Sequence, residues 1–332
     1  MSGAPLLDRI RGSLYGLAIG DALGAPVEGW SAARIRAEHG WISDFVQDEV
    51  AGTDDTEFAA LTARILCRAR GEPAPELLAA MWLEYCADWP ERFDLMSPGG
   101  MSEKRAVANL LKGLLPPLSG RDHMANDSCG AAMRIAPCGL AAPGDVDLAR
   151  RLARADASVS HWNEGVIQAE AIAAGVSAAA GGGAWAETVD AALDALPADS
   201  WTRRTVATCW EAARGHTDAP ERAAAVWTVS DTGVPASHGP SACALALTAL
   251  RCGEGRFADS VLLAVNAGRD CDSSAAQVGG IVGALVGFDG LPPHWVERIG
   301  PLPGAVLTPT RGLVLDDLAA DVAGLAAELT DP

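Results

Sequence analysis

The chain has 332 residues, and its 43 acidic side chains outnumber its 25 basic ones, which gives a formal net charge of −18. This balance excludes a sequence-independent binder of nucleic acid or of anionic membranes, because both activities need a basic surface. Hydrophobic residues make up 49% of the chain and charged residues 20%, a composition that excludes a disordered protein.

Segments of helical periodicity alternate with short Gly and Pro breaks along the whole chain. Alternating strand patterns bounded by hairpin signals are absent, so the sequence predicts an all-α fold. Breakers such as Pro116-Pro117 and Pro292-Pro293 fall between the predicted helices. We interpret residues 1–332 as one domain. In chain order the predicted helices are Leu6–Leu23, Asp55–Arg70, Pro75–Ala87, Glu103–Leu114, Asp147–Val159, Glu164–Ala180, Trp185–Leu196, Arg203–Ala213, Ser241–Cys252, Phe257–Asn266, Ser273–Val286 and Leu315–Leu329.

Two predicted helices carry glycine at every fourth position. Glycine costs a helix roughly 0.5 to 1 kcal/mol per position relative to alanine, so its repetition indicates that another helix packs closely there. A phosphate-binding loop is not indicated, because no GxxxxGK[ST] motif occurs. The glycines are Gly12, Gly16, Gly20 and Gly24 in the first helix, and Gly279, Gly283 and Gly287 in the later one.

The sequence favours a cytoplasmic protein. The N-terminus lacks the features of a signal peptide, and no apolar run is long enough to span a bilayer. Eight cysteines occur without a CxxC pair, which favours buried reduced thiols over a zinc site or disulfides.

Three acidic, oxygen-rich segments stand out as candidate sites. The first, Gly52-Thr53-Asp54-Asp55-Thr56, precedes an amphipathic helix, and the second, Gly268-Arg269-Asp270-Cys271-Asp272-Ser273, precedes the later glycine-rich helix. The third is Glu28, just past the end of the first helix. Hydroxyl and carboxylate groups at a helix start cap free backbone N–H groups, so capping alone is one interpretation. Asp54 and Glu57 have the spacing of a capping box.

A metal site is the other interpretation of the two helix starts. Each start carries two carboxylates with neighbouring hydroxyls, whereas a cap needs only one side chain. Adjacent buried carboxylates repel each other, and a divalent cation removes that cost. Oxygen donors without His or Cys favour Mg²⁺, Mn²⁺ or Ca²⁺ over Zn²⁺. If the two starts face each other in the fold, they form a two-metal site.

Several motifs in a fixed order make the chain resemble the ADP-ribosylglycohydrolase family. Their order is far more specific than any single motif. They are Gly20-Asp21-Ala22-Leu23-Gly24-Ala25-Pro26 with Glu28, Thr53-Asp54-Asp55-Thr56, Asn126-Asp127-Ser128 followed by Gly130-Ala131-Ala132-Met133-Arg134, His161, and Asn266-Ala267-Gly268-Arg269-Asp270-Cys271-Asp272-Ser273.

This resemblance implies an all-α orthogonal multi-helix bundle with a binuclear metal cleft. It implies two Mg²⁺ ions, with Mn²⁺ as the alternative, which hold the ribose diol while a metal-activated water attacks the anomeric carbon. Asp55 is the first candidate for the carboxylate that accepts the proton of this water, and Glu28 is the second. The implied metal ligands are Thr53, Asp54, Asp55, Asp270, Asp272 and Ser273; the family usually has Thr at the last position.

The resemblance also implies a pocket for ADP-ribose. Its contacts would come from Asn126, Asp127, Ser128 and Gly130, with His161 lining the pocket. The loop is about two residues shorter than the family pattern after Ser128. A polar turn and a structural histidine are the competing interpretations of these residues.

The predicted activity is that of a glycoside hydrolase acting on N- or O-glycosyl bonds. The main hypothesis is Mg-dependent release of ADP-ribose from an acceptor, with a protein arginine side chain favoured. The partner would then be an ADP-ribosylated protein. The shortened loop motivates an alternative, a hydrolase of a small ribosyl or ADP-ribosyl metabolite or nucleobase adduct. A non-catalytic protein that binds ADP-ribose is the second alternative.

Overall fold

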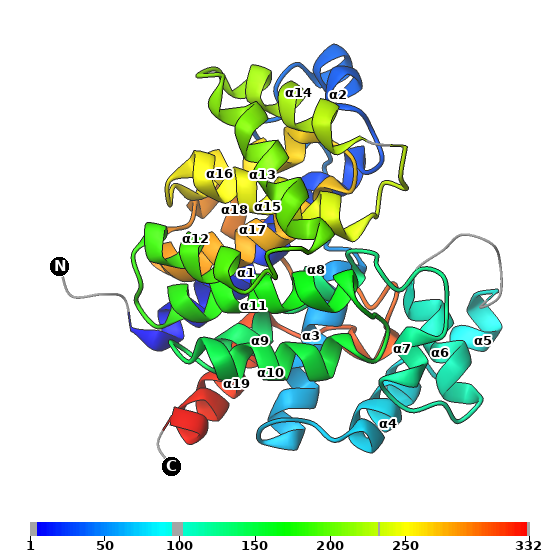
Figure 1. The fold of residues 1–332 in the computed structure, drawn as a ribbon. Helices are drawn as coiled ribbons and strands as arrows, with labels where there is room; N and C mark the ends of the chain where they lie inside the picture. Colours follow the sequence, from blue (N-terminus) through cyan, green and yellow to red (C-terminus); the bar gives the residue numbers. More distant parts are fainter. Residues whose placement is uncertain (1–4, 95–101, 232, 331–332) are drawn as a thin grey trace.

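The computed structural model describes residues 5–94, 102–231 and 233–330, and within these ranges the fold is all-α. No strand occurs in this part of the chain, where the only bridge pairs are Ser31–Gly268 and Ser128–His238. Figure 1 shows the arrangement of the longer helices, which are α1 (Leu6–Gly24), α2 (Ala32–His39), α3 (Asp54–Ala69), α4 (Pro75–Tyr85), α6 (Ser102–Leu111), α10 (Val146–Ala157), α11 (Glu164–Ala180), α12 (Trp185–Asp194), α13 (Trp201–Arg214), α14 (Ala219–Ser230), α15 (Gly239–Gly253), α16 (Phe257–Ala267), α17 (Cys271–Val286) and α19 (Leu315–Thr330). Shorter α-helices are α5 (Trp89–Arg92), α7 (Leu118–Arg121), α8 (Gly130–Met133), α9 (Ala136–Leu140) and α18 (Pro293–Val296), and 3₁₀ turns cover Ala25–Val27, Phe288–Gly290 and Thr308–Thr310.

The glycine-rich helices α1 and α17 pack directly against each other, which supplies the close helix neighbour that the four-residue spacing predicts for each of them. A Cβ added at Gly12 would lie 2.3 Å from the carbonyl oxygen of Gly283, and one at Gly16 would lie 2.3 Å from that of Gly279. At the other end of this contact, a Cβ at Gly24 would lie 2.4 Å from the Cα of Asp272. The absence of side chains therefore brings the acidic start of α17 against the end of α1.

The predicted helices are all present, with ends that coincide with the prediction or shift by at most three residues. The helix predicted to begin at Asp55 begins at Asp54, and the one predicted from Ser273 begins at Cys271. Among the longer helices, α2 and α14 were not predicted, because Ala32–His39 is short and polar and α14 has Pro220 in its first turn. The short helices α5, α7, α8, α9 and α18 were not predicted either. The prediction of a single domain stays a prediction.

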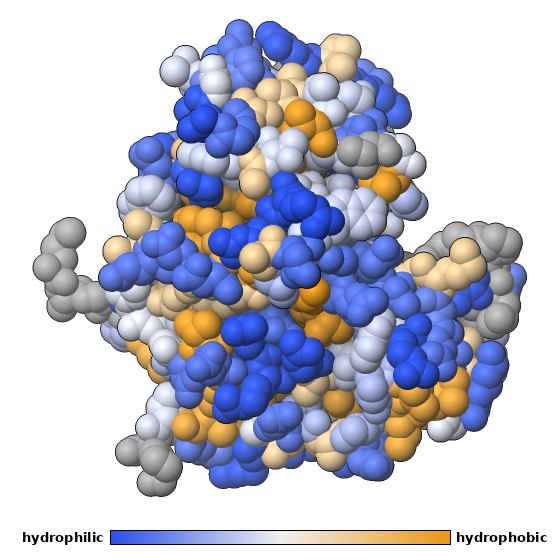
Figure 2. Space-filling model, in the orientation of Figure 1, coloured by the Kyte–Doolittle hydropathy of each residue, from blue (hydrophilic) through white to orange (hydrophobic). Residues whose placement is uncertain are grey.

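The surface and interior agree with the composition. Within the described residues no helix is long and apolar enough to cross a membrane. All eight cysteines are free, and six of them are buried, as expected for reduced thiols. On the face in Figure 2, hydrophobic residues form separate patches among a hydrophilic majority.

Candidate metal centre

The start of α3 is fixed by a carboxylate from α1. Asp21 is completely buried, and its Oδ2 accepts hydrogen bonds from the backbone N–H of Thr53 at 2.8 Å and of Thr56 at 3.2 Å. The hydroxyl of Thr56 donates to the same oxygen. Asp21 lies in the motif of residues 20–26, but no role was predicted for it from the sequence. A charged residue inside an otherwise apolar glycine-rich helix was the signal that could have found it.

The predicted capping box at this helix start is not formed. Thr53 is the N-cap residue, and its Oγ1 accepts a hydrogen bond of 3.4 Å from the backbone N–H of Asp55. Glu57 turns away to residues 305–307, where its carboxylate accepts the backbone N–H groups of Ala305 at 2.6 Å and Val306 at 3.0 Å. Glu57 therefore anchors a distant loop, and Asp54 is not part of a capping box.

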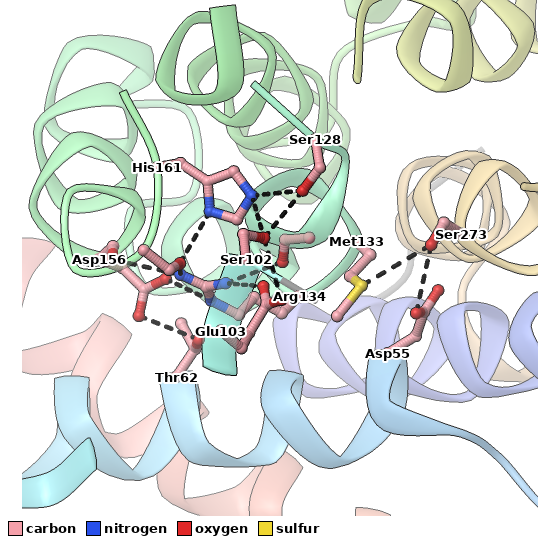
Figure 3. Close-up of polar contacts among 12 residues, drawn as sticks. Asp55, Thr62, Ser102, Glu103, Ser128, Met133, Arg134, Asp156, His161 and Ser273 are labelled. Carbon is pink, nitrogen blue, oxygen red and sulfur yellow. Dashed lines mark hydrogen bonds and ion pairs between the residues drawn. The ribbon is translucent and has the colours of Figure 1, made fainter. Parts of the chain in front are cut away.

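The starts of α3 and α17 meet, although more than two hundred residues separate them in the sequence. The hydroxyl of Ser273 donates to Oδ1 of Asp55 at 3.3 Å, as Figure 3 shows. The Oγ of Ser273 also lies 3.7 Å from the sulfur of Met133, on α8. The thiol of Cys129, just before α8, donates to Oδ2 of Asp270 at 3.1 Å. Three segments from different parts of the chain thus converge on one point.

Glu28 joins the same group of carboxylates. Ligand oxygens of Glu28, Asp270 and Asp272 all lie within 4.8 Å of one another. Asp270 and Asp272 are buried, whereas Glu28 is exposed, and Thr53 and Asp54 are half-buried. The cluster therefore reaches the surface on the side of Glu28 and Asp54. We call the residues Asp21, Glu28, Thr53, Asp54, Asp55, Asp270, Asp272 and Ser273 the acidic cluster.

Burial and mutual repulsion dominate the electrostatics of the acidic cluster. Burial raises the pKa of Asp21 to about 6 and, together with Glu103 and Asp21, raises that of Asp54 to about 8. The pKa of Asp55 lies well above its ordinary value because of burial and the charge of Asp272. Burial also raises the pKa of Asp272, with Asp270 adding to the effect. In the described part of the chain, no Lys or Arg forms an ion pair with any of these carboxylates.

The donor set fits a hard divalent cation. Three buried carboxylate oxygens, Asp21 Oδ1, Asp55 Oδ2 and Asp272 Oδ1, have no hydrogen-bond partner among the described residues. Leaving such atoms buried and unpaired is costly, and cations bound by the cluster would remove that cost. All available donors are carboxylate or hydroxyl oxygens apart from the neighbouring Cys129, a set typical of Mg²⁺, Mn²⁺ or Ca²⁺ sites. The acidic cluster could therefore hold a metal ion.

The loop predicted to contact ADP-ribose lies beside the acidic cluster, linked to it through Cys129. The carbonyl oxygens of Asn126, Asp127 and Ser128 accept hydrogen bonds from Trp162 N–H, Gly239 N–H and Gln168 Nε2. The backbone N–H groups of Asn126 and Asp127 donate to no acceptor among the described residues. Gly130 is buried, and a Cβ there would lie 2.2 Å from Glu103 Oε1. Gly130 is thus a packing position, and the N–H groups before it are the ones free to bind an anion.

His161 is inside the protein, at the back of this loop. It is completely buried, and its Nε2 lies 3.0 Å from Ser102 Oγ and 2.9 Å from Ser128 Oγ (Figure 3). Its Nδ1 lies 2.8 Å from Ser160 Oγ. Burial lowers the pKa of His161 well below its ordinary value, so the ring is neutral. Both ring nitrogens thus lie within hydrogen-bond distance of serine hydroxyls, and His161 holds the side chain of Ser128 from the protein interior.

Comparison with known proteins identifies the family. The model for the ADP-ribosylglycohydrolase family matches residues 2–331. The chain belongs to the ADP-ribosylglycohydrolase family. It is accordingly a glycosyl hydrolase, and the acidic cluster lies at the motifs that carried the resemblance.

Individual relatives match this chain either over most of its length or over one short region. The uncharacterized protein YegU of Escherichia coli (strain K12) is 29% identical over 315 residues, which cover 86% of this chain and 90% of YegU. An uncharacterized protein of Archaeoglobus fulgidus is 32% identical over 311 residues, 88% of this chain and 92% of that protein. ADP-ribosylarginine hydrolase Tri1 of Pseudomonas putida (strain GB-1) is 51% identical, but over only 43 residues, 13% of this chain and 12% of Tri1.

A solved structure shows the same fold. The ADP-ribosylglycohydrolase-related protein complex superposes with a TM-score of 0.69 over 97% of this chain and 99% of that chain, at 24% sequence identity. The all-α bundle predicted from the sequence is therefore the fold of this family.

Proposed function

We propose that this protein hydrolyses the glycosidic bond between ADP-ribose and an acceptor, in a reaction that depends on Mg²⁺, with a protein arginine side chain as the favoured acceptor. The observation that carries the proposal is the contact of Ser273 with Asp55 beside the carboxylate group of Glu28, Asp270 and Asp272. Among the described residues, one buried oxygen each of Asp55 and Asp272 has no hydrogen-bond partner. Family membership supports the reaction class. The 43-residue likeness to two proteins named ADP-ribosylarginine hydrolase supports the acceptor.

The acidic cluster would hold two Mg²⁺ ions, or Mn²⁺ in their place. We propose Thr53, Asp54, Asp55, Asp270, Asp272 and Ser273 as the ligands, with Glu28 and Asp21 next to them. When bound, the ions would supply Lewis acidity, which polarises substrate oxygens and makes water a better nucleophile. Ser273 holds one oxygen of Asp55 by a hydrogen bond, which leaves Oδ2 to receive a proton from the attacking water. Glu28, exposed at the edge of the cluster, is the second candidate for this role.

The loop at 126–130 would bind the pyrophosphate of the substrate. The free N–H groups of Asn126 and Asp127 are suitable donors to an anion. Ser128 is held in place from inside by His161 and Ser102, so its contribution would be positioning of the loop. The glycosidic bond at the anomeric carbon of the ribose would then lie beside Asp55.

A panel of substrates tests the proposal. ADP-ribosyl-arginine peptide, ADP-ribosyl-serine peptide and ADP-ribosylated nucleobase are incubated with the protein and Mg²⁺, and released ADP-ribose is quantified with and without EDTA. We expect Mg-dependent release with a preference for the arginine substrate. Asp54→Ala and Asp272→Ala should each lose more than about 100-fold activity, because each removes a ligand from a shared cluster. Asp194→Ala, an exposed change on α12, should keep full activity.

Failure of this panel separates the alternatives. Absence of ADP-ribose from every substrate would overturn the proposal. Turnover of a ribosyl compound that lacks the ADP moiety would instead favour the small-metabolite hydrolase, which the shortened loop motivates. A cytoplasmic location stays a prediction.

A further inference from the structure

Arg269, next to the proposed ligand Asp270, has a backbone conformation that its residue type disfavours. Its φ is +64°, in the left-handed region, and the preceding Gly268 also has a positive φ of +73°. The left-handed region is unfavourable for a residue with a Cβ, and glycine would adopt it freely. Such conformations persist where surrounding contacts hold them and often mark functional positions.

The guanidinium of Arg269 holds the segment of residues 233–238. The Arg269 side chain is 5% exposed, and its Nη1 pairs with Asp231 Oδ1 at 2.9 Å. Its Nη2 donates to the carbonyl oxygens of Val234 at 3.2 Å and Pro235 at 2.8 Å. One planar group thus makes two hydrogen bonds to a segment that has no helix or strand of its own, and a third to Asp231 at the end of α14.

The backbone of Arg269 holds a second segment, the turn that carries Glu28. Its N–H donates to the carbonyl of Trp30 at 2.8 Å, and its carbonyl accepts the N–H of Gly29 at 2.6 Å. Glu28 precedes Gly29 in the chain and Asp270 follows Arg269, and ligand oxygens of Glu28 and Asp270 lie within 4.8 Å of each other. Arg269 therefore connects the acidic cluster, the Glu28 turn and residues 233–238.

The 233–238 segment in turn borders the loop proposed to bind pyrophosphate. The carbonyl of Ser237 accepts the N–H of Cys129 at 3.0 Å, and Ser128 and His238 form a bridge pair. This segment thus contacts the loop directly and, through Arg269, the acidic cluster, so a substrate held by both would lie near it.

We propose that Arg269 is a positioning residue that fixes residues 233–238 as a substrate-contacting segment beside the acidic cluster, without serving in metal binding. The substrate part of this inference rests on the proposed hydrolase function. The positioning part does not, because it concerns only the order of the segment in the free protein.

The test is Arg269→Gly. This change removes the guanidinium, and because glycine adopts a φ of +64° freely, it also removes the backbone strain. Asp231, left without its partner, is more than a third exposed and can be solvated by water, so we expect the variant to fold. The matched control is Arg70→Gly, since Arg70 also has a positive φ, of +55°, and pairs with Glu328 at 2.7 Å on the surface. Arg269→Lys, which keeps the charge but not the planar fork, serves as a second variant that retains the backbone conformation.

Three measurements decide the outcome. Hydrogen exchange of residues 233–238 in Arg269→Gly should accelerate at least about 10-fold, as expected when two hydrogen bonds to a segment are lost. The thermal stabilisation by Mg²⁺ should stay unchanged. The KM for the ADP-ribosyl substrate should rise about 10-fold with kcat within about 3-fold, and Arg269→Lys should fall in between.

Each contrary result overturns a distinct statement. Unchanged exchange in both Arg269 variants would overturn the positioning role, even if the wild-type protein has no ADP-ribosyl hydrolase activity. Loss of the Mg²⁺ stabilisation would show that Arg269 acts on the metal centre. An accelerated exchange with unchanged KM would remove the segment from the substrate site, and the same KM change in Arg70→Gly would make the effect non-specific.

Discussion

Two clusters of buried charge lie along α3, and they are neutralised in different ways. Near the middle of the helix, Thr62 bonds to Asp156, which pairs with Arg134 at 2.9 Å, while Arg134 also pairs with Glu103 at 3.3 Å. At the start of the helix, Asp54 and Asp55 belong to the acidic cluster, whose carboxylates form no ion pair with a Lys or Arg of the described residues. A buried cluster that contains its own cation is complete as a structural element, whereas one without it could take up a cation from solution.

Arg134→Met should have the largest effect, because it removes the internal cation. Glu103 and Asp156 would remain buried, and a broken buried pair costs about 3–5 kcal/mol. The loss of unfolding free energy should be the same with and without Mg²⁺ in urea titrations. Arg214→Met, which breaks an exposed pair with Glu211, should cost less than about 1 kcal/mol. An equally small effect at Arg134 would contradict the structural role of this cluster.

Gly20→Ala tests the packing that builds the acidic cluster. A Cβ there would lie 2.2 Å from the carbonyl oxygen of Ala275, so the variant forces α1 and α17 apart and should lose about 1–3 kcal/mol. The thermal stabilisation by Mg²⁺ should fall as well, because the start of α17 moves. Gly324→Ala, on α19 with open space around it, should be neutral or stabilising. An unaltered Mg²⁺ response in Gly20→Ala would show that the spacing tolerates a shift.

Asp272→Asn should change stability in opposite directions with and without metal. Burial and the charge of Asp270 raise the pKa of Asp272, so the ionised form is disfavoured in the metal-free fold and the neutral amide should stabilise that state. In Mg²⁺ the variant should lose the stabilisation that the wild type gains. Melting curves in EDTA and in Mg²⁺ measure both effects. A lower melting temperature in EDTA would show that Asp272 is a structural carboxylate.

His161→Gln should have the smallest effect, visible as a change in acid sensitivity. The pKa of His161 is lowered in the folded protein, chiefly by burial and then by the charge of Arg134, so unfolding takes up a proton once the pH falls below about 6.5. Between about pH 7.5 and pH 5.5 the wild type should therefore lose about 1 kcal/mol more than the variant. Parallel curves for the two proteins would contradict the neutral buried ring.

Much of the fold was predictable because its helices have clear periodicity and clear ends. The glycine spacing also predicted a close helix neighbour for α1 and for α17, but it did not predict that the two helices are each other's neighbour. Helix α14 was missed because Pro220 within its first turn reads as a break, although proline is favourable at that place.

The acidic cluster was only partly predictable. Thr53 to Asp55 and Asp270 to Ser273 are adjacent in sequence, so their motifs are visible there, and the fold brings them together. Asp21 was overlooked because its role depends on α3 docking against α1, a contact that no local pattern encodes. The buried position of His161 could not be predicted either, since two of its three serine partners, Ser102 and Ser128, are distant from it in the sequence.

The anchoring of Glu57 to residues 305–307 has a consequence for how the protein is made. On the ribosome, the first turn of α3 is synthesised long before the loop that secures it, and Asp21 emerges well before Asp270 and Asp272. The half of the acidic cluster contributed by the N-terminal helices must therefore wait for residues 270–307. We expect the cluster to assemble late, and a nascent chain stalled before residue 270 would carry only Asp21, Glu28 and Thr53 to Asp55 of it.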